Sequence, residues 1–464
     1  MNRSNSGGDP PEQPPAASSA EPEIGLWDPL GAWPQARPLL WSFLAIIAGS
    51  AMVPHYLDQL SRRDNSITDF FQEWASARNF LEGLPVYTNH RVTIPRYLGK
   101  MNPGAGDLFV EINAHPPTSV LITIPFGALS YCNALLVWNI LSLCALFTSL
   151  WLVWRGLGIP FRRWSPLPTM TLLLLCFPLL MHIHFGQTTL LILLLLTGTW
   201  AADRVGRRMI AGALLGTAVT VKLFPAVVFL FFAFNRNWKT IASGSVSIGL
   251  ITLATRLVLG SECYVTYAST VVPRVAKYQG LWFNLSLPGY WAKLFNPSAE
   301  YPFVQPLSIC PALARSATIL SCLIIFVVLA RAATRAKTRA ELDLSFGLTL
   351  TAMLLISPIT WDHYLLLLLL PLTMAWIHLP RSQGPRVLLV AIVVAFWTWP
   401  YFVFDLTIPG GIVNGTAYPI HTLTVGSYQC YALLALFALE IVELRRLVMA
   451  RARSLPAQVD TVAL

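Results

Sequence analysis

The chain has 464 residues, of which 55% are hydrophobic and 12% are charged, and its formal net charge is +10. Typical soluble domains carry about 25% charged residues. The composition therefore excludes an ordinary soluble multidomain enzyme as well as a disordered or fibrous chain, and it predicts an all-α polytopic membrane protein. No basic cluster is interleaved with aromatic residues, so we expect no nucleic-acid partner and assign the positive charge to cytoplasmic loops.

Composition also divides the chain into three parts. Residues 1–37 are rich in Pro, Ser and Glu and cannot bury enough apolar surface to fold alone, which predicts a disordered cytoplasmic tail. A single transmembrane domain follows over 38–448, and a short basic tail over 449–464 closes the chain. We expect both tails to lie in the cytoplasm.

Ten apolar segments approach the roughly 20 residues that a membrane-spanning helix needs. They are 39–57, 133–154, 167–184, 188–202, 240–260, 312–334, 344–358, 361–379, 386–404 and 426–444. A further apolar run, 209–234, is interrupted by the sequence VKLFP. The total is ten spans, or twelve if this interrupted run crosses the membrane fully.

The positions of Lys and Arg predict the orientation, because basic residues gather in cytoplasmic loops. The clusters lie near 155–163, 204–208, 236–239, 331–339, 381–386 and 445–453. The run 209–234 has basic residues at both ends, so it must start and finish on the same side. Thirteen helical residues rise only about 20 Å, and we therefore predict two short helices that turn near Lys222 and Pro225.

The same orientation places three long connections, 58–132, 261–311 and 405–425, on the non-cytoplasmic side, so we expect function on the outer face. In the first of them, the spacing of apolar residues from Asp69 to Leu81 predicts an amphipathic helix on the membrane surface, capped by Thr68. Asp69 then either complements the helix dipole or takes part in chemistry. The apolar stretch 118–130 is too short to span and predicts a surface or re-entrant helix.

Lys222 and His363 are the other outer-face candidates. A lysine in an apolar run is costly and functional by default, where it could hold a phosphate, unless it snorkels to the surface. His363, between two apolar runs, could transfer a proton or form a hydrogen bond, or it could simply begin a capped helix beside Trp361. His182 and His184 do not share a helical face, which argues against zinc.

Six strings occur in the order found in glycosyltransferase family 87, and the chain resembles that family of GT-C type membrane enzymes over roughly 65–380. The strings are TDFFQEWASARNFLEGLPVY, AHPPTSVLITIPFGALS, HFGQTTLLILLLL, VKLFPAVVFLF, FNLSLPG and SPITWDHYLLLLLLPL. The family includes polyprenyl-phosphate-mannose-dependent α-1,2-mannosyltransferases. The resemblance implies a GT-C-like helical bundle, with Asp69 as the catalytic base. Lys222 and His363 match its conserved lysine and histidine, and Tyr364 stands where the family often has a second histidine.

This resemblance implies transfer of a hexose, expected to be mannose, from a polyprenyl-phosphate donor to a hydroxyl of a glycan or glycolipid acceptor, with inversion. We expect Lys222 and Arg274 to offset the charge of the leaving phosphate, and Gln187, Asn284 and Trp361 to bind the substrates. No metal or cofactor is expected, and the protein would sit among the lipids of the plasma membrane with its active site outside the cytoplasm. The alternatives are a flippase or transporter of a lipid-linked sugar, and a GT-C enzyme that uses a pentose such as arabinose.

Overall fold

The computed structural model describes residues 36–61, 67–99, 111–159, 166–300, 303–380, 382–408 and 416–454. Over these residues the chain is helical, and the only β pairing among them is a single bridge between Val304 and Ala417. The predicted all-α architecture is confirmed. The predicted N-terminal tail up to residue 35 and the last ten residues of the basic tail lie outside the described residues.

The helices follow one another with short connections. In chain order they are α1 (Ala36–Leu60), α2 (Phe70–Leu81), α3 (His90–Leu98), α4 (Pro117–Gly127), α5 (Tyr131–Leu157), α6 (Pro166–Leu174), α7 (Phe177–Phe185), α8 (Thr189–Arg204), α9 (Arg208–Val221), η1 (Phe224–Val227), α10 (Val228–Phe234), α11 (Trp238–Leu259), α12 (Glu262–Thr266), η2 (Tyr267–Val271), α13 (Val272–Ala276), η3 (Lys277–Gly280), α14 (Leu287–Phe295), α15 (Pro311–Arg335), α16 (Arg339–Ile356), η4 (Asp362–Leu368), α17 (Leu369–His378), α18 (Gln383–Trp397), α19 (Pro400–Thr407), α21 (Pro419–Leu423), η5 (Val425–Ser427) and α22 (Tyr428–Ser454).

Helices occupy all ten segments that hydropathy predicted as spans. Four of them, α1, α5, α11 and α15, are continuous helices long and apolar enough to cross a membrane. Two more spans are possible if α6 with α7, bent by 61°, and α18 with α19, bent by 81°, each count as one. By length and composition the described residues thus contain four to six spans, fewer than the ten to twelve predicted.

The difference arises because several of the apolar helices are too short to span a membrane or carry charged residues, and some of them are also covered by protein. α8 has 16 residues and α17 has ten, and α16 begins with buried acidic residues and is buried over nearly its whole length. By contrast, only 11% of the apolar window of α1 and of α11 is buried. Their exposed apolar faces are those of helices that contact lipid.

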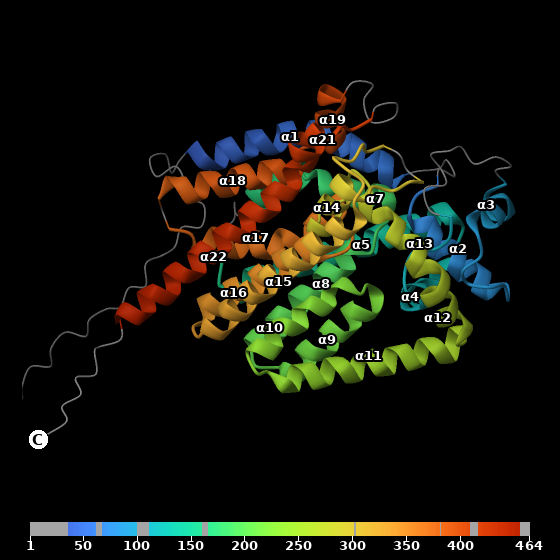
Figure 1. Cartoon of the computed structure of the whole chain (residues 1–464), viewed down its shortest axis with the longest axis horizontal. Coiled ribbons are helices and arrows are strands. Elements are labelled where there is room, and N and C mark those ends of the chain that lie inside the picture. Colours follow the sequence, from blue (N-terminus) through green and yellow to red (C-terminus); the bar gives the residue numbers. More distant parts are fainter. Residues whose placement is uncertain are drawn as a thin grey trace, which may run out of the picture.

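Basic residues lie together at one end of the helical bundle, where α8, α10 and α15 end and α16 begins. Asn237 Nδ2 donates to Asp203 Oδ1 (2.9 Å) and Arg451 donates to the carbonyl of Arg335 (3.1 Å), while Arg204 pairs with Asp343. These contacts join the ends of α8, α10, α15, α16 and α22. At the opposite end of the molecule, α2, α3, α4, α12 and α13 gather, away from the C-terminal end of α22 (Figure 1). Within the described residues, these basic ends therefore lie apart from α2, α3, α4, α12 and α13.

The interrupted run 209–234 folds as the predicted hairpin of two short helices. α9 ends at Val221, Lys222 is extended, and η1 and α10 return the chain toward the start of α9. Figure 1 shows α9 and α10 between α8 and the long helix α11. A Cβ on Gly216 would lie 2.4 Å from the carbonyl oxygen of Gly244, so glycines at these positions allow α9 and α11 to pack closely. This packing fixes the depth of the turn that carries Lys222.

The first outer segment differs from its prediction. The helix after Asp69 is present as α2, but it is buried on most of its surface between α4 and α5 rather than lying on a membrane. Thr68 does not cap it, because its hydroxyl pairs with that of Tyr131 (2.9 Å). The stretch predicted as a short surface or re-entrant helix forms α4, which packs against α2 and α11.

Candidate active site

A cavity of about 840 Å³ lies where the outer segments meet the ends of the apolar helices. Its polar lining comes from segments far apart in the chain and includes Asp69, Gln72, His90, His115, Gln187, Lys222, Asp362, His363 and Tyr364. Most of the remaining lining is apolar or aromatic. The cavity can therefore take an amphipathic ligand, with its polar groups at one wall and its apolar part against the other.

Asp69 is held at the start of α2 by packing on both sides. The neighbouring Phe70 stacks on Trp138, with ring centroids 5.5 Å apart. The chain opposite turns at Gly186, whose φ of +65° and close contact with Phe70 and Leu135 leave no room for a side chain. This turn ends α7 and brings Gln187 to the carboxyl group of Asp69.

Gln187 joins Asp69 to Lys222. Its amide Nε2 donates to Asp69 Oδ2 over 2.6 Å, and its Oε1 lies 3.5 Å from Lys222 Nζ. The backbone carbonyl of Gln187 accepts a hydrogen bond from Trp138 Nε1 (3.2 Å), which fixes the residue in place. A carboxylate and an ammonium group are thus set on the two sides of one glutamine.

Lys222 is held by the break in the hairpin and by Tyr364. The extended backbone at Lys222 directs the side chain out of the helix line. Its Nζ donates to the Tyr364 hydroxyl (2.9 Å) and lies 4.5 Å from the centroid of the Tyr364 ring. The ring also stacks on Phe224. Lys222 is only 5% exposed, so it does not snorkel to the surface but presents its charge inside the cavity.

The carboxyl group of Asp69 has an unusual pKa. Its pKa is raised from 3.8 to about 6 in total: burial is the largest cause, and the charge of nearby Glu73 adds to the rise, whereas His115, Lys222 and the hydrogen bond from Gln187 oppose it. A carboxylate with a pKa of about 6 is mostly ionised at pH 7, yet it is a stronger base than an ordinary aspartate. These are the properties of a general base.

The hydrogen bond from Gln187 predicts how activity depends on pH. Because a base acts in its deprotonated form, kcat/KM should fall as the pH drops below the pKa of Asp69. Gln187→Met removes a hydrogen bond that lowers this pKa, so the acid limb of the profile should move to higher pH. The exposed Gln383 allows the matched control Gln383→Met. An acid limb that stays in place in Gln187→Met would show that the contact does not tune the base.

A second charged pair lies directly beside Asp69 and was not predicted from the sequence. Glu73, one turn further along α2, contacts the Nδ1 atom of His115. The segment that carries His115 is fixed by two hydrogen bonds, from Ala114 N to Gln72 Oε1 (3.0 Å) and from His115 N to Asn113 Oδ1 (2.9 Å). His115 faces the cavity, so the pair can offer its imidazole to a polar group of a ligand there.

His363 and Trp361, which were candidates from the sequence, both line the cavity. Nδ1 of His363 lies 3.3 Å from Asp362 Oδ1, but neither ring nitrogen makes a hydrogen bond within the described chain. Trp361 packs on Phe283 with ring centroids 4.8 Å apart. The imidazole lies beside Asp362, and its ring nitrogens can bind a polar group of a ligand.

Two predicted residues do not line this cavity. Arg274 lies in a smaller neighbouring pocket, paired with Glu111 at 3.4 Å. Asn284 is fully buried, and it holds its own loop against the segment before Trp361: its Nδ2 donates to the carbonyl of Pro358 (2.9 Å) and its Oδ1 accepts from Thr360 N (2.9 Å). Asn284 therefore shapes the wall of the cavity from behind.

The described residues contain no group of three or more His, Cys, Asp or Glu side chains placed to hold a metal ion. Cys263 and Cys310, which bracket an outer connection, are both free thiols.

Comparison with known proteins identifies the chain's relatives. The sequence profile of glycosyltransferase family 87 matches residues 113–358, more than half of the chain. The chain belongs to glycosyltransferase family 87. The match includes His115, Gln187 and Lys222, whereas Asp69 and His363 lie outside it.

A curated relative of this family 87 chain is the polyprenol-phosphate-mannose-dependent alpha-(1-2)-phosphatidylinositol pentamannoside mannosyltransferase of Mycolicibacterium smegmatis. The two sequences are 26% identical over 280 residues, which cover 59% of this chain and 63% of the relative. The chain thus spans less than two thirds of the length of that relative. No solved structure matches the chain.

Proposed function

We propose that this chain is a membrane mannosyltransferase that moves mannose from a polyprenyl-phosphate donor to a hydroxyl of a glycolipid acceptor. The observation that carries the proposal is the linked arrangement of Asp69, Gln187 and Lys222 in a largely apolar cavity. A base and a phosphate-binding cation are the two groups that such a transfer needs. Membership of family 87 and the name of the mycobacterial relative support the donor.

In the proposed step, Asp69 takes the proton of the acceptor hydroxyl as the hydroxyl oxygen attacks the anomeric carbon. The glycosidic bond forms while the bond between the anomeric carbon and the phosphate oxygen breaks, and polyprenyl phosphate leaves with that electron pair. Attack from the opposite side inverts the anomeric carbon, so a β-linked donor gives an α-linked product. Lys222 and His115 stabilise the charge that develops on the leaving phosphate.

The remaining cavity residues bind and orient the substrates. His363 presents a ring nitrogen to a donor or acceptor oxygen, and Trp361 with Phe283 forms a flat surface against which a sugar ring can pack. The apolar wall accepts the first isoprene units of the lipid. We further propose that the cavity faces the outside of the plasma membrane, because the basic ends of the helices gather at the opposite end of the molecule.

The proposal is tested with purified protein in liposomes that contain polyprenyl-phosphate mannose with radiolabelled mannose and a glycolipid acceptor. We expect the label to appear in the glycolipid, in a linkage cleaved by an α-mannosidase, with or without EDTA. Transfer from the corresponding arabinose donor instead would identify a pentosyltransferase. Movement of the intact donor across the bilayer without a new glycosidic bond would identify a flippase and overturn the proposal.

A further inference from the structure

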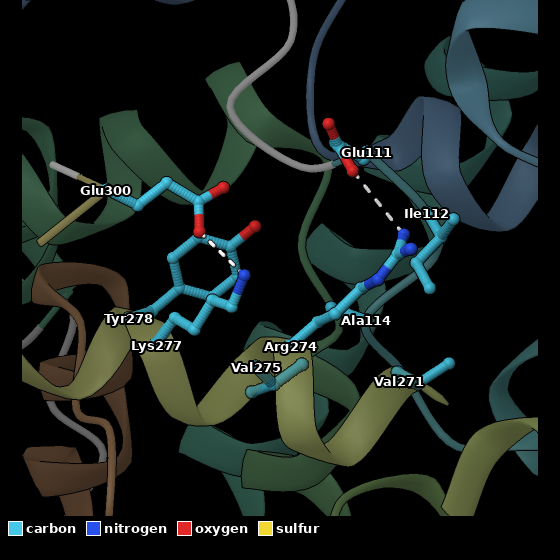
Figure 2. Close-up of a pocket in the computed structure, with 9 residues that line it drawn as sticks. All are labelled: Glu111, Ile112, Ala114, Val271, Arg274, Val275, Lys277, Tyr278 and Glu300. Atoms are coloured by element: carbon cyan, nitrogen blue, oxygen red, sulfur yellow. Dashed lines mark hydrogen bonds and ion pairs between the residues drawn. The ribbon is translucent and has the colours of Figure 1, made fainter. Parts of the chain in front are cut away.

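A small pocket beside the main cavity combines four charged side chains. It has a volume of about 100 Å³, roughly that of three water molecules. Its charged lining consists of Glu111, Arg274, Lys277 and Glu300. Figure 2 shows Arg274 of α13 reaching toward Glu111 and Lys277, at the start of η3, reaching toward Glu300. The exposed fractions of these side chains lie between 39% and 55%, so the pocket is open to a ligand from outside.

This pocket adjoins the main cavity directly. Ala114, Val275 and Tyr278 line both of them, and Ala114 precedes the His115 that contacts Glu73 beside Asp69. A ligand that extends from the small pocket past Val275 therefore enters the cavity on the side of the proposed base. An acceptor that binds in the small pocket can therefore place a hydroxyl at Asp69.

The charge of the pocket indicates the chemistry of its ligand. Each cation is already paired with a carboxylate, Arg274 with Glu111 at 3.4 Å and Lys277 with Glu300 at 2.8 Å. The four side chains carry no net charge, and an anionic group near the cations would also meet two carboxylates. A polyhydroxyl ligand fits better, because each hydroxyl can donate to a carboxylate oxygen and accept from a guanidinium or ammonium group.

We propose that this pocket is the acceptor subsite. It binds the hydroxyls of an uncharged sugar in the acceptor's glycan, and it thereby places a hydroxyl of the neighbouring acceptor sugar at Asp69. The proposal rests on the transferase function proposed above and assigns Arg274 to the acceptor rather than to the donor phosphate. Exposed ion pairs are weak enough to rearrange around a ligand. The subsite would explain why the long connection that contains α12, α13 and η3 lies beside the main cavity.

The kinetics of two single variants, each lacking one of the two carboxylates, test the subsite. In Glu111→Gln and in Glu300→Gln the acceptor KM should rise about tenfold, which corresponds to one lost hydrogen bond to a charged group. The donor KM and kcat should stay within about twofold of wild type, in keeping with a site remote from the phosphate. If the pocket bound an anionic group of either substrate, removing a negative charge from the pocket would instead lower the KM for that substrate. A lowered KM, a raised donor KM, or no change in either would each overturn the proposal.

A binding measurement separates the subsite from the transferase reaction itself. Soluble α-linked mannotriose, titrated by calorimetry into the full-length protein in lipid nanodiscs, should bind wild type about tenfold more tightly than either variant, and inorganic phosphate should not compete. Glu82→Gln provides the matched control, because Glu82 pairs with Arg78 and Arg96 away from the main cavity. It should bind like wild type. Binding that is retained in a protein without transfer activity would overturn the proposed function and keep the subsite.

Discussion

Asp69→Asn should reduce the rate of mannose transfer by about 10²–10⁴-fold, the contribution of a positioned general base. The substitution keeps the size of the side chain, and the amide oxygen can still accept the hydrogen bond from Gln187 that Asp69 Oδ2 accepts over 2.6 Å. It removes the negative charge of the carboxylate together with the ability to take a proton. The expected loss is in kcat, measured with saturating radiolabelled donor in liposomes, while the donor KM changes little.

The control for this substitution is Asp58→Asn, at an exposed aspartate near the end of α1. It should transfer mannose like wild type, and both variants should be extracted from membranes in similar amount and elute as single peaks in detergent. Turnover by Asp69→Asn within about threefold of wild type, far short of the loss of a base, would rule out Asp69 as the base.

Lys222→Met should raise the donor KM about 10- to 100-fold, since a hydrogen bond to a charged group contributes about 1.5–3 kcal/mol. Methionine occupies similar space but has no charge for the phosphate. The same substitution removes a positive charge that lowers the pKa of Asp69, so the acid limb of the pH profile should also move to higher pH. Donor KM is measured above that limb to separate the two effects.

Lys239→Met is the matched control, because Lys239 is exposed near the start of α11, at the basic end of the bundle. Its donor KM should equal that of wild type. Tyr364→Phe leaves the charge of Lys222 in place and removes only the hydroxyl that Lys222 contacts, so its effect should be smaller than that of Lys222→Met. An unchanged donor KM in Lys222→Met would exclude the phosphate role.

Hydropathy located the apolar helices because the length of an apolar run is a local property of the chain. It could not show which runs are bent or which are covered by protein. The bend between α6 and α7 lies at Leu175 and Cys176, just before Pro178 in the first turn of α7. A proline is tolerated in the first turn of a helix but not in its interior, so Pro178 marks a helix start within the apolar run. The burial of α2 depends on α4 and α5, which its own amphipathic pattern does not encode.

Only the part of the site that depends on local sequence features could be predicted. Lys222 stands out because a charge in an apolar run is costly, and Asp69 was identified by resemblance. The pairing of Glu73 with His115 could not be predicted. Glu73 resembles an ordinary acidic residue in the first turn of a helix, and His115 comes from a distant segment of the chain. Tyr364 was noted only as a departure from the family pattern, yet it holds Lys222. Pairings between distant segments leave no spacing that a single sequence reveals.

The short hairpin has a consequence for how the protein is made. α9 and α10 have 14 and seven residues, which rise only about 21 and 10 Å, so neither is a stable membrane insertion unit during synthesis. α9 packs on α8, which precedes it, but its glycine face is covered only when α11 has been synthesised and Gly244 meets Gly212 and Gly216. A bulky residue at one of these glycines should therefore appear as degraded, incompletely assembled chains and a low yield, rather than as a stable enzyme with altered kinetics.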